Sequence, residues 1–150
     1  MSTVKHSAAF RINQPVEEVF PLHSPEGEKL WVPGWDYVNI MGSTELHEDY
    51  IFLTKNHHHA GTDAIWMVKR YEPENYFVQF CRVEPEDKVG VVSVRCTPLE
   101  KQLTEVEVTY QYTALGKKCE EFIEGFTASN YQMFISEWKQ QLETYFDSIG

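Results

Sequence analysis

Apolar and polar residues alternate with a period of two along the first twelve residues of the chain. Every second position from Val4 to Ile12 lies on one side, which also carries His6, and this pattern is typical of a strand. Asn13-Gln14-Pro15 ends the alternation, and a proline suits the first turn of a helix. The pattern predicts a short helix from residue 16 to about 20 and a second one from residue 24, capped by Ser24, to about 31.

Strand-like runs follow and are separated by short stretches of turn residues. They cover residues 37–43, 50–57, 64–71, 76–83, 89–97 and 104–113. Connections this short force neighbouring strands to be antiparallel, because a parallel crossover needs about a dozen residues or more. In the last run, Val106, Val108, Tyr110 and Tyr112 alternate with polar residues and are predicted to face the interior. In residues 64–71 both faces are apolar, so the pattern does not say which one is buried.

The period changes to that of a helix from about residue 117 to residue 148. The predicted apolar stripe consists of Phe122, Phe126, Met133, Trp138, Leu142, Tyr145 and Ile149. Gly125 is unexpected there, because a glycine inside a helix costs about 1 kcal/mol relative to alanine. It indicates a close backbone contact, a bend, or simply a tolerated glycine.

Composition excludes several classes of function. A length of 150 residues predicts one domain covering residues 1–150. The net charge of -10 argues against nucleic acid as a partner and against an anionic membrane surface. Three widely spaced cysteines favour neither a disulfide framework nor a zinc site. We expect no membrane span and no secretory signal, and the cytoplasm is the simplest compartment.

Two local motifs carry a resemblance to a known family. Residues 10–20 read F-x-I-x-x-P-V-E-E-V-F, and residues 27–36 read G-E-K-L-W-V-P-G-W-D. With the predicted order of elements, the chain resembles the START-like superfamily, also called Bet v 1-like or SRPBCC, and within it an uncharacterised polyketide-cyclase-like branch. The resemblance implies an α+β helix-grip fold. In that fold a seven-stranded antiparallel sheet wraps round a long C-terminal helix, with two short helices after the first strand.

The same resemblance implies an apolar cavity between the sheet and the long helix. The expected function is binding of a small hydrophobic or aromatic molecule there. One alternative is a polyketide cyclase or hydratase using cavity acid–base residues, and another is a protein-interaction module without a ligand. The residues that we expect as candidates for the cavity are His6, Trp31, Trp35, Trp66, Arg95, Val108, Tyr110, Tyr112, Phe126 and Met133.

Several candidates also have a purely structural interpretation. His6 can be a core histidine that bonds to a neighbour, and Trp31 and Trp35 can fix the short helices to the sheet instead of gating the cavity. Arg95 is expected to be exposed unless it is paired. If it pointed inward, it would anchor an anion or a carbonyl group. Glu28 could reach the cavity, although a surface or structural role is the simpler prediction.

The consecutive histidines His57, His58 and His59 invite a metal-site hypothesis. His57 and His59 would point the same way on a strand, but no carboxylate lies at a defined ligand spacing, so we expect a solvated strand end and no metal. No nucleophile elbow, Walker loop or Rossmann fingerprint occurs, so the sequence identifies no catalytic residue and no cofactor. Besides the small molecule, a homodimer stays open as an assembly.

Overall fold

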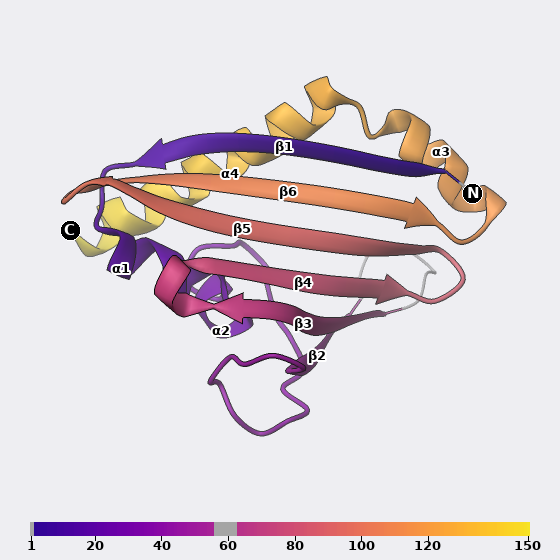
Figure 1. Cartoon of the computed structure of the whole chain (residues 1–150), viewed down its shortest axis with the longest axis horizontal. Helices are drawn as coiled ribbons and strands as arrows, with labels where there is room; N and C mark the ends of the chain where they lie inside the picture. Colours follow the sequence, from indigo (N-terminus) through magenta and orange to yellow (C-terminus); the bar gives the residue numbers. More distant parts are fainter. Residues whose placement is uncertain (1, 56–62) are drawn as a thin grey trace.

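The computed structural model describes residues 2–55 and 63–150, and an antiparallel sheet is its largest element (Figure 1). In the described residues the sheet has six strands in the order β1-β6-β5-β4-β3-β2. Their bounds are β1 (Thr3–Ile12), β2 (Ile51–Thr54), β3 (Ala64–Glu72), β4 (Phe77–Glu84), β5 (Lys88–Glu100) and β6 (Leu103–Ala114). Sequential strands are neighbours from β2 to β6, as the short connections predicted, and β1 closes the order beside β6.

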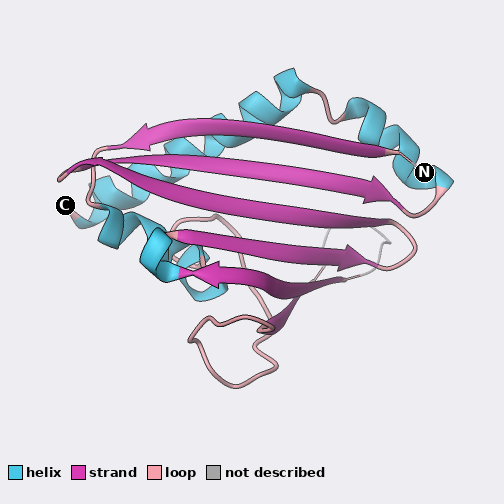
Figure 2. Cartoon of the chain, in the orientation of Figure 1, coloured by secondary structure: helices cyan, strands magenta, loops and turns pink. Residues whose placement is uncertain are grey.

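The predicted seventh strand, residues 37–43, is wrong. Only Val38 pairs with β2, through a single bridge to Leu53. The chain then turns away, because the Gly42 N–H bonds to Oδ1 of Asn39 and Gly42 adopts a positive φ of 79°. Residues 29–50 therefore run mostly as a loop beside the short edge strand β2 (Figure 2).

The segment after β1 forms three very short helical pieces instead of two. They are α1 (Val16–Val19), the 3-10 helix η1 (Phe20–His23) and α2 (Pro25–Glu28). Ser24 caps α2 as predicted, because its Oγ accepts a hydrogen bond from the Gly27 N–H at 2.9 Å. Gly27 is required by packing, since a Cβ atom there would lie 2.3 Å from the carbonyl oxygen of Pro21. The pieces are thus folded tightly on one another.

The predicted long helix is divided in two. It consists of α3 (Lys117–Gly125) and α4 (Ala128–Ile149), with a further 3-10 turn, η2 (Pro73–Asn75), elsewhere between β3 and β4. Thr127 starts α4, because its side chain accepts a hydrogen bond from the Asn130 N–H. Gly125 is the last residue of α3, so of the three readings of that glycine the bend is the one observed.

The division also shifts the buried stripe of α4. Tyr131, Ile135, Trp138, Leu142 and Phe146 are buried, whereas the predicted Met133 is 66% exposed. Trp138 and Leu142 had been assigned to the correct face. The apolar stripe of α3 cannot be extended into α4, because residues 126 and 127 between the two helices are not helical.

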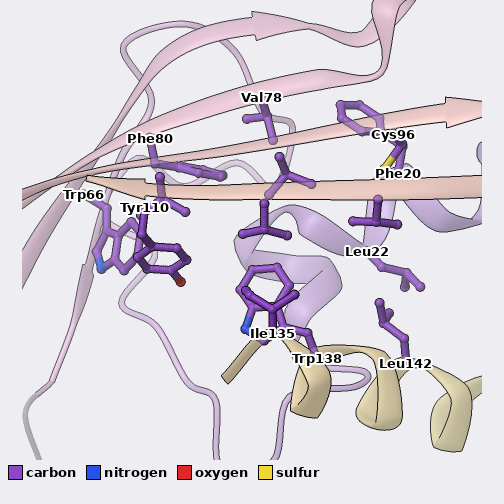
Figure 3. Packing of buried hydrophobic residues seen from close by; sticks show 14 of the residues in the cluster. Phe20, Leu22, Trp66, Val78, Phe80, Cys96, Tyr110, Ile135, Trp138 and Leu142 are labelled. Carbon is purple, nitrogen blue, oxygen red and sulfur yellow. The ribbon is translucent and has the colours of Figure 1, made fainter. Parts of the chain in front are cut away.

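The core lies between one face of the sheet and α4 (Figure 3). Ile135, Trp138 and Leu142 of α4 face strand residues such as Phe80 and Tyr110. The predicted inner face of β6 is confirmed, since Val106, Val108, Tyr110 and Tyr112 are all buried. On β3 the buried face carries Ala64, Trp66 and Val68, and Ile65 and Met67 are exposed on the other. The chain is therefore an α+β structure in which a sheet holds a C-terminal helix.

Candidate ligand-binding cavity

A cavity of about 220 Å³ lies between the inner face of the sheet and α4, next to α2. Its apolar lining comes from Pro25, Val32, Trp35, Phe52, Trp66, Phe80, Val92, Val94, Phe134 and Trp138. Five residues contribute polar side chains: Glu28, Arg82, Tyr110, Glu137 and Gln141. A mostly apolar hollow with a few convergent polar groups is typical of small-molecule sites.

Aromatic rings make the wall that β2, β3 and β4 provide. Phe52 stacks on Trp66 with ring centroids 5.5 Å apart, and Phe80 meets Trp66 edge-on at 5.9 Å. The indole N–H of Trp66 donates to Thr54 Oγ1, and that of Trp35 donates to the Pro25 carbonyl oxygen. These two indoles therefore have their N–H groups satisfied by the protein and offer apolar ring surface to the cavity.

Glu28, the last residue of α2, places a carboxyl group in this apolar surrounding. The residue is only partly buried because it borders the hollow, but protein encloses the carboxyl, and this burial raises the pKa of Glu28 to about 8. Among the described residues, no hydrogen bond or ion pair to its carboxyl is found. Loss of hydration disfavours the charged carboxylate, which is the physical cause of the raised pKa of Glu28. Glu28 is therefore mostly protonated at neutral pH.

Arg82 of β4 enters the cavity from the sheet. Its guanidinium carbon lies 5.0 Å from the centroid of the Trp66 ring. Its Nε is 3.6 Å from Oε2 of Glu84, which is too long for a hydrogen bond, and in the described residues this buried Nε has no hydrogen-bond partner. Glu84 is shared, because Lys88 Nζ lies 3.2 Å from the same Oε2. The Nε–H group of Arg82 is therefore a hydrogen-bond donor without a partner in the described part of the chain.

Tyr110 of β6 points its hydroxyl group from the sheet toward α4 (Figure 3). Burial, followed by the neighbouring charges of Tyr112 and Glu28, raises the pKa of Tyr110 well above its usual range. The phenol therefore stays protonated and can donate a hydrogen bond. Glu28, Arg82 and Tyr110 come from α2, β4 and β6, so the fold brings together polar groups that are distant in the sequence.

Three of the candidates predicted from the sequence line the cavity: Trp35, Trp66 and Tyr110. Trp31 does not; it is buried beside them and donates from Nε1 to the Leu22 carbonyl oxygen at 2.6 Å, which fixes the short helices. Val108 is fully buried under α4, where its carbonyl accepts from the Tyr131 hydroxyl.

The remaining candidates lie elsewhere. Tyr112 packs under α3 against Phe122 and Phe126. His6 takes the structural role, because its Nε2 donates to the Phe126 carbonyl oxygen at 2.6 Å. Met133 is on the exposed face of α4. Arg95 is exposed on the outer face of the sheet, where its guanidinium carbon lies 4.4 Å from the centroid of the Phe77 ring.

Sequence reasoning did not single out Arg82, although it lies on a predicted strand. The alternation of β4 was the available signal: Val78, Phe80 and Arg82 share a face, and the first two are buried. Glu28 had been considered for the cavity, although a surface or structural role was the preferred prediction. Phe52, Val94 and Phe134 were missed because apolar residues of a strand or helix do not reveal which of them border a hollow.

Neither a metal-binding group of side chains nor a helix fit to span a membrane occurs in the part of the chain that the structure describes. Among residues 2–55 and 63–150, no group of three or more His, Cys, Asp and Glu side chains is arranged to hold a metal ion. His57, His58 and His59 lie outside the described residues. Within the same described ranges no helix is long and apolar enough to cross a membrane. The three cysteines are free thiols.

Comparisons with known proteins give matches in structure. No model of a known family matches the sequence, and no curated protein matches it either. Norcoclaurine synthase from Thalictrum flavum, in complex with dopamine and hydroxybenzaldehyde, is similar with a TM-score of 0.66 and 11% identity, over 95% of this chain and 87% of the synthase. Ara h 8.0201 is similar with a TM-score of 0.70 and 8% identity, over 98% of this chain and 99% of its own.

A structural-genomics protein from Rhodobacter sphaeroides also matches, with a TM-score of 0.66 and 15% identity, over 99% of this chain and all of its own, 100%. Identities this low show a shared fold, but they do not show that this chain has the activity of the similar proteins. The matches agree with the resemblance carried by residues 10–20 and 27–36, although they do not separate the branches within the superfamily. The chain therefore shares the fold of norcoclaurine synthase and of Ara h 8.0201, as the resemblance implied.

Proposed function

We propose that the protein binds a small hydrophobic or aromatic molecule in the cavity between the sheet and α4. The observation that carries the proposal is the cavity itself, about 220 Å³ of space with aromatic walls and only five polar side chains in its lining. Drug-sized sites usually measure about 300–1,000 Å³. The smaller volume favours a ligand with one or two aromatic rings over a sterol.

Thermal unfolding with a ligand panel tests this proposal. The panel holds naphthalene derivatives, flavonoids, aromatic polyketides, fatty acids and sterols. A ligand at a hundred times its Kd stabilises the folded state by about 2.7 kcal/mol, which raises the Tm of a chain this long by about 5–10 °C. The small aromatic compounds should raise the Tm in proportion to the logarithm of their concentration.

A variant that fills the cavity supplies the control. Val94 is 1% exposed and borders the hollow, so Val94→Phe should occupy the space and abolish the Tm shift. Val91 lies on the same strand with its side chain on the outer face, and Val91→Phe should leave the shift unchanged. If no compound shifts the wild-type Tm, the binding proposal fails and an interaction module without a ligand takes its place.

A second candidate is an enzyme that uses Glu28 as a proton donor or acceptor. A carboxyl group that is mostly protonated at neutral pH, beside the protonated phenol of Tyr110, supports it. Solvent deuterium exchange at the carbon next to a carbonyl group of an aromatic ketone would detect such proton transfer by NMR. Glu28→Gln should abolish the exchange while ligand-induced Tm shifts persist. Exchange at the rate of the buffer alone would remove this candidate.

Four expectations from the sequence stay predictions. These are the polyketide-cyclase-like branch, the cytoplasmic location, the absence of a nucleic-acid partner and the homodimer. Size-exclusion chromatography with light scattering measures the last of these directly.

A further inference from the structure

Among the described residues, Arg82 is the cationic side chain that lines the cavity. Arg82 carries a permanent positive charge, because a guanidinium group does not deprotonate in proteins. Its nearest carboxylate, Glu84, is 3.6 Å from Nε and is also 3.2 Å from Lys88 Nζ. Lys88 has a second partner in Asp87 at 2.8 Å, so the cluster of these four residues carries two charges of each sign. The guanidinium remains the charged group of this cluster that lines the cavity.

The Arg82 guanidinium is also held in place. It lies over the Trp66 ring, and Trp66 is itself fixed by its bond to Thr54 and by stacking on Phe52. A planar guanidinium held this way presents its N–H groups in a fixed plane, which suits the two oxygens of a carboxylate. The buried Nε has no partner within hydrogen-bond distance among the described residues, so this N–H is a donor that a ligand oxygen can use.

The carboxyl of Glu28 does not oppose an anion near neutral pH. Burial raises the pKa of Glu28 to about 8, so below that pH the group is a neutral hydrogen-bond donor. Tyr110 is a second neutral donor, because its pKa is raised well above the usual range. Glu137 of α4 is the other acidic residue of the lining, and it is exposed to solvent.

We propose, on the basis of the ligand-binding function above, that the cavity selects small aromatic acids, with the ligand carboxylate bound by Arg82 and hydrogen-bonded by Glu28 or Tyr110. The aromatic part of such a ligand would lie against Trp35, Phe80 and Val94. A neutral compound of the same shape would leave the Arg82 donors unused. An amine would place a second positive charge near the guanidinium.

A charge series on the wild-type protein tests the selection. The probes are 2-naphthoate, 2-naphthylmethanol and 2-naphthylmethylamine, which share one ring system and differ in charge. Quenching of tryptophan fluorescence at pH 6.5 reports their Kd values. Naphthoate should bind about tenfold or more tighter than the alcohol, as expected for hydrogen bonds to a charged group, and the amine should bind weakest. Equal affinities, or preference for the amine, would overturn the proposal.

Variants of the two stacked arginines identify the group responsible. Arg82→Gln should weaken naphthoate binding about tenfold or more and change binding of the alcohol less than about twofold. Arg82→Lys should recover part of the affinity for the acid. Arg95→Gln is the matched control, because Arg95 also stacks on a ring, that of Phe77, but on the outer face of the sheet. Circular dichroism and the Tm establish that each variant is folded.

The pH dependence supplies an independent readout. Raising the pH from 6.5 to 9 ionises Glu28, with its pKa of about 8, so naphthoate should weaken and the amine should strengthen. Arg82 and Tyr110, which line the same space, keep their protons in this range, and Glu28→Gln should remove the change. If the alcohol binds and the acid shows neither preference nor pH dependence, acid selection fails while ligand binding stands. If none of the three probes binds, acid selection fails, and the Tm shifts with the wider ligand panel decide the binding proposal.

Discussion

Replacing Glu28 with glutamine should stabilise the protein in a pH-dependent manner. Burial raises the pKa of Glu28 from 4.5 to about 8 in the folded state. The folded state therefore holds this proton more tightly than the unfolded state does. The stability that Glu28 contributes is complete below pH 4.5, and it is lost as the pH rises through about 8.

The size of the effect follows from the gap between the two pKa values. Each pH unit above 4.5 costs the folded state about 1.4 kcal/mol, so the loss at pH 7 reaches about 3 kcal/mol. Glutamine is neutral at every pH and avoids this loss. Glu28→Gln should thus equal the wild type near pH 4.5, exceed its free energy of unfolding by about 3 kcal/mol at pH 7, and level off above pH 8.

Urea unfolding followed by circular dichroism at pH 4.5, 7 and 8.5 measures this difference. All other titrating groups contribute equally to variant and wild type, so they cancel. Glu121→Gln, on the exposed face of α3, is the control and should change stability by less than about 0.5 kcal/mol at each pH. A difference for Glu28→Gln that stays constant with pH would refute the assignment of an enclosed carboxyl group.

Other positions give sharp expectations for stability, all measured by urea unfolding. Trp138→Ala should cost about 3–5 kcal/mol because Trp138 is 9% exposed, whereas Met133→Ala, on the exposed face of α4, should cost less than about 1 kcal/mol; similar losses would contradict the observed stripe. Gly27→Ala should cost about 3 kcal/mol or more, since its Cβ would meet backbone at 2.3 Å, while Gly125→Ala, with nothing within 4 Å of its Cβ, should be near neutral. His23 is 1% exposed, and burial lowers its pKa from 6.5 to about 4. The free energy of unfolding should therefore fall by about 3 kcal/mol between pH 6.5 and 4, because the unfolded state takes up the proton first. A loss of the same size in the His23→Phe variant would exclude His23 as the cause.

The elements that could be predicted from the sequence are those whose pattern reports burial on one face. β6 is an example, because Val106 to Tyr112 alternate strictly with polar residues and the buried face followed directly. Residues 37–43 show where prediction from composition ends. They have the composition of a strand, but a strand forms only if a neighbouring strand offers a free edge along the whole segment. Here the turn at Gly42 ends the pairing after Val38.

The α4 stripe failed for a related reason. A helical period can be read only within one helix, and the break after Gly125 resets the phase. Tyr131 was left out of the predicted stripe and Met133 included, although they are two positions apart and lie on different faces. The signal that was available is Thr127, a residue type that favours the start of a helix, followed three positions later by Asn130, whose N–H it binds.

The sequence predicted aromatic residues of the cavity wall, but it did not predict the arginine that lines the cavity. Aromatic residues such as Trp66 and Tyr110 are expected inside, so naming them required only the strand pattern. Arg82 and Arg95 are both arginines on strands, and the usual expectation for either is solvent. Pairing between β4 and β5 places Arg95 opposite Phe77 and Arg82 opposite Gly90. The alternation of β4, counted from the buried Phe80, puts Arg82 on the inner face, and the alternation of β5, counted from the buried Val94, puts Arg95 on the outer face.

The short pieces after β1 connect the stability of the fold to the chemistry of the cavity. His23 ends η1 and packs between Trp31 and Trp138, with ring centroids 5.6 and 5.9 Å away. Glu28 ends α2 only five positions later, at the cavity. Burial disfavours the charge on both, which costs stability in acid through His23 and in base through Glu28. A bound carboxylate would favour protonated Glu28, so an aromatic acid should widen the alkaline side of the stability range and leave the acid side unchanged.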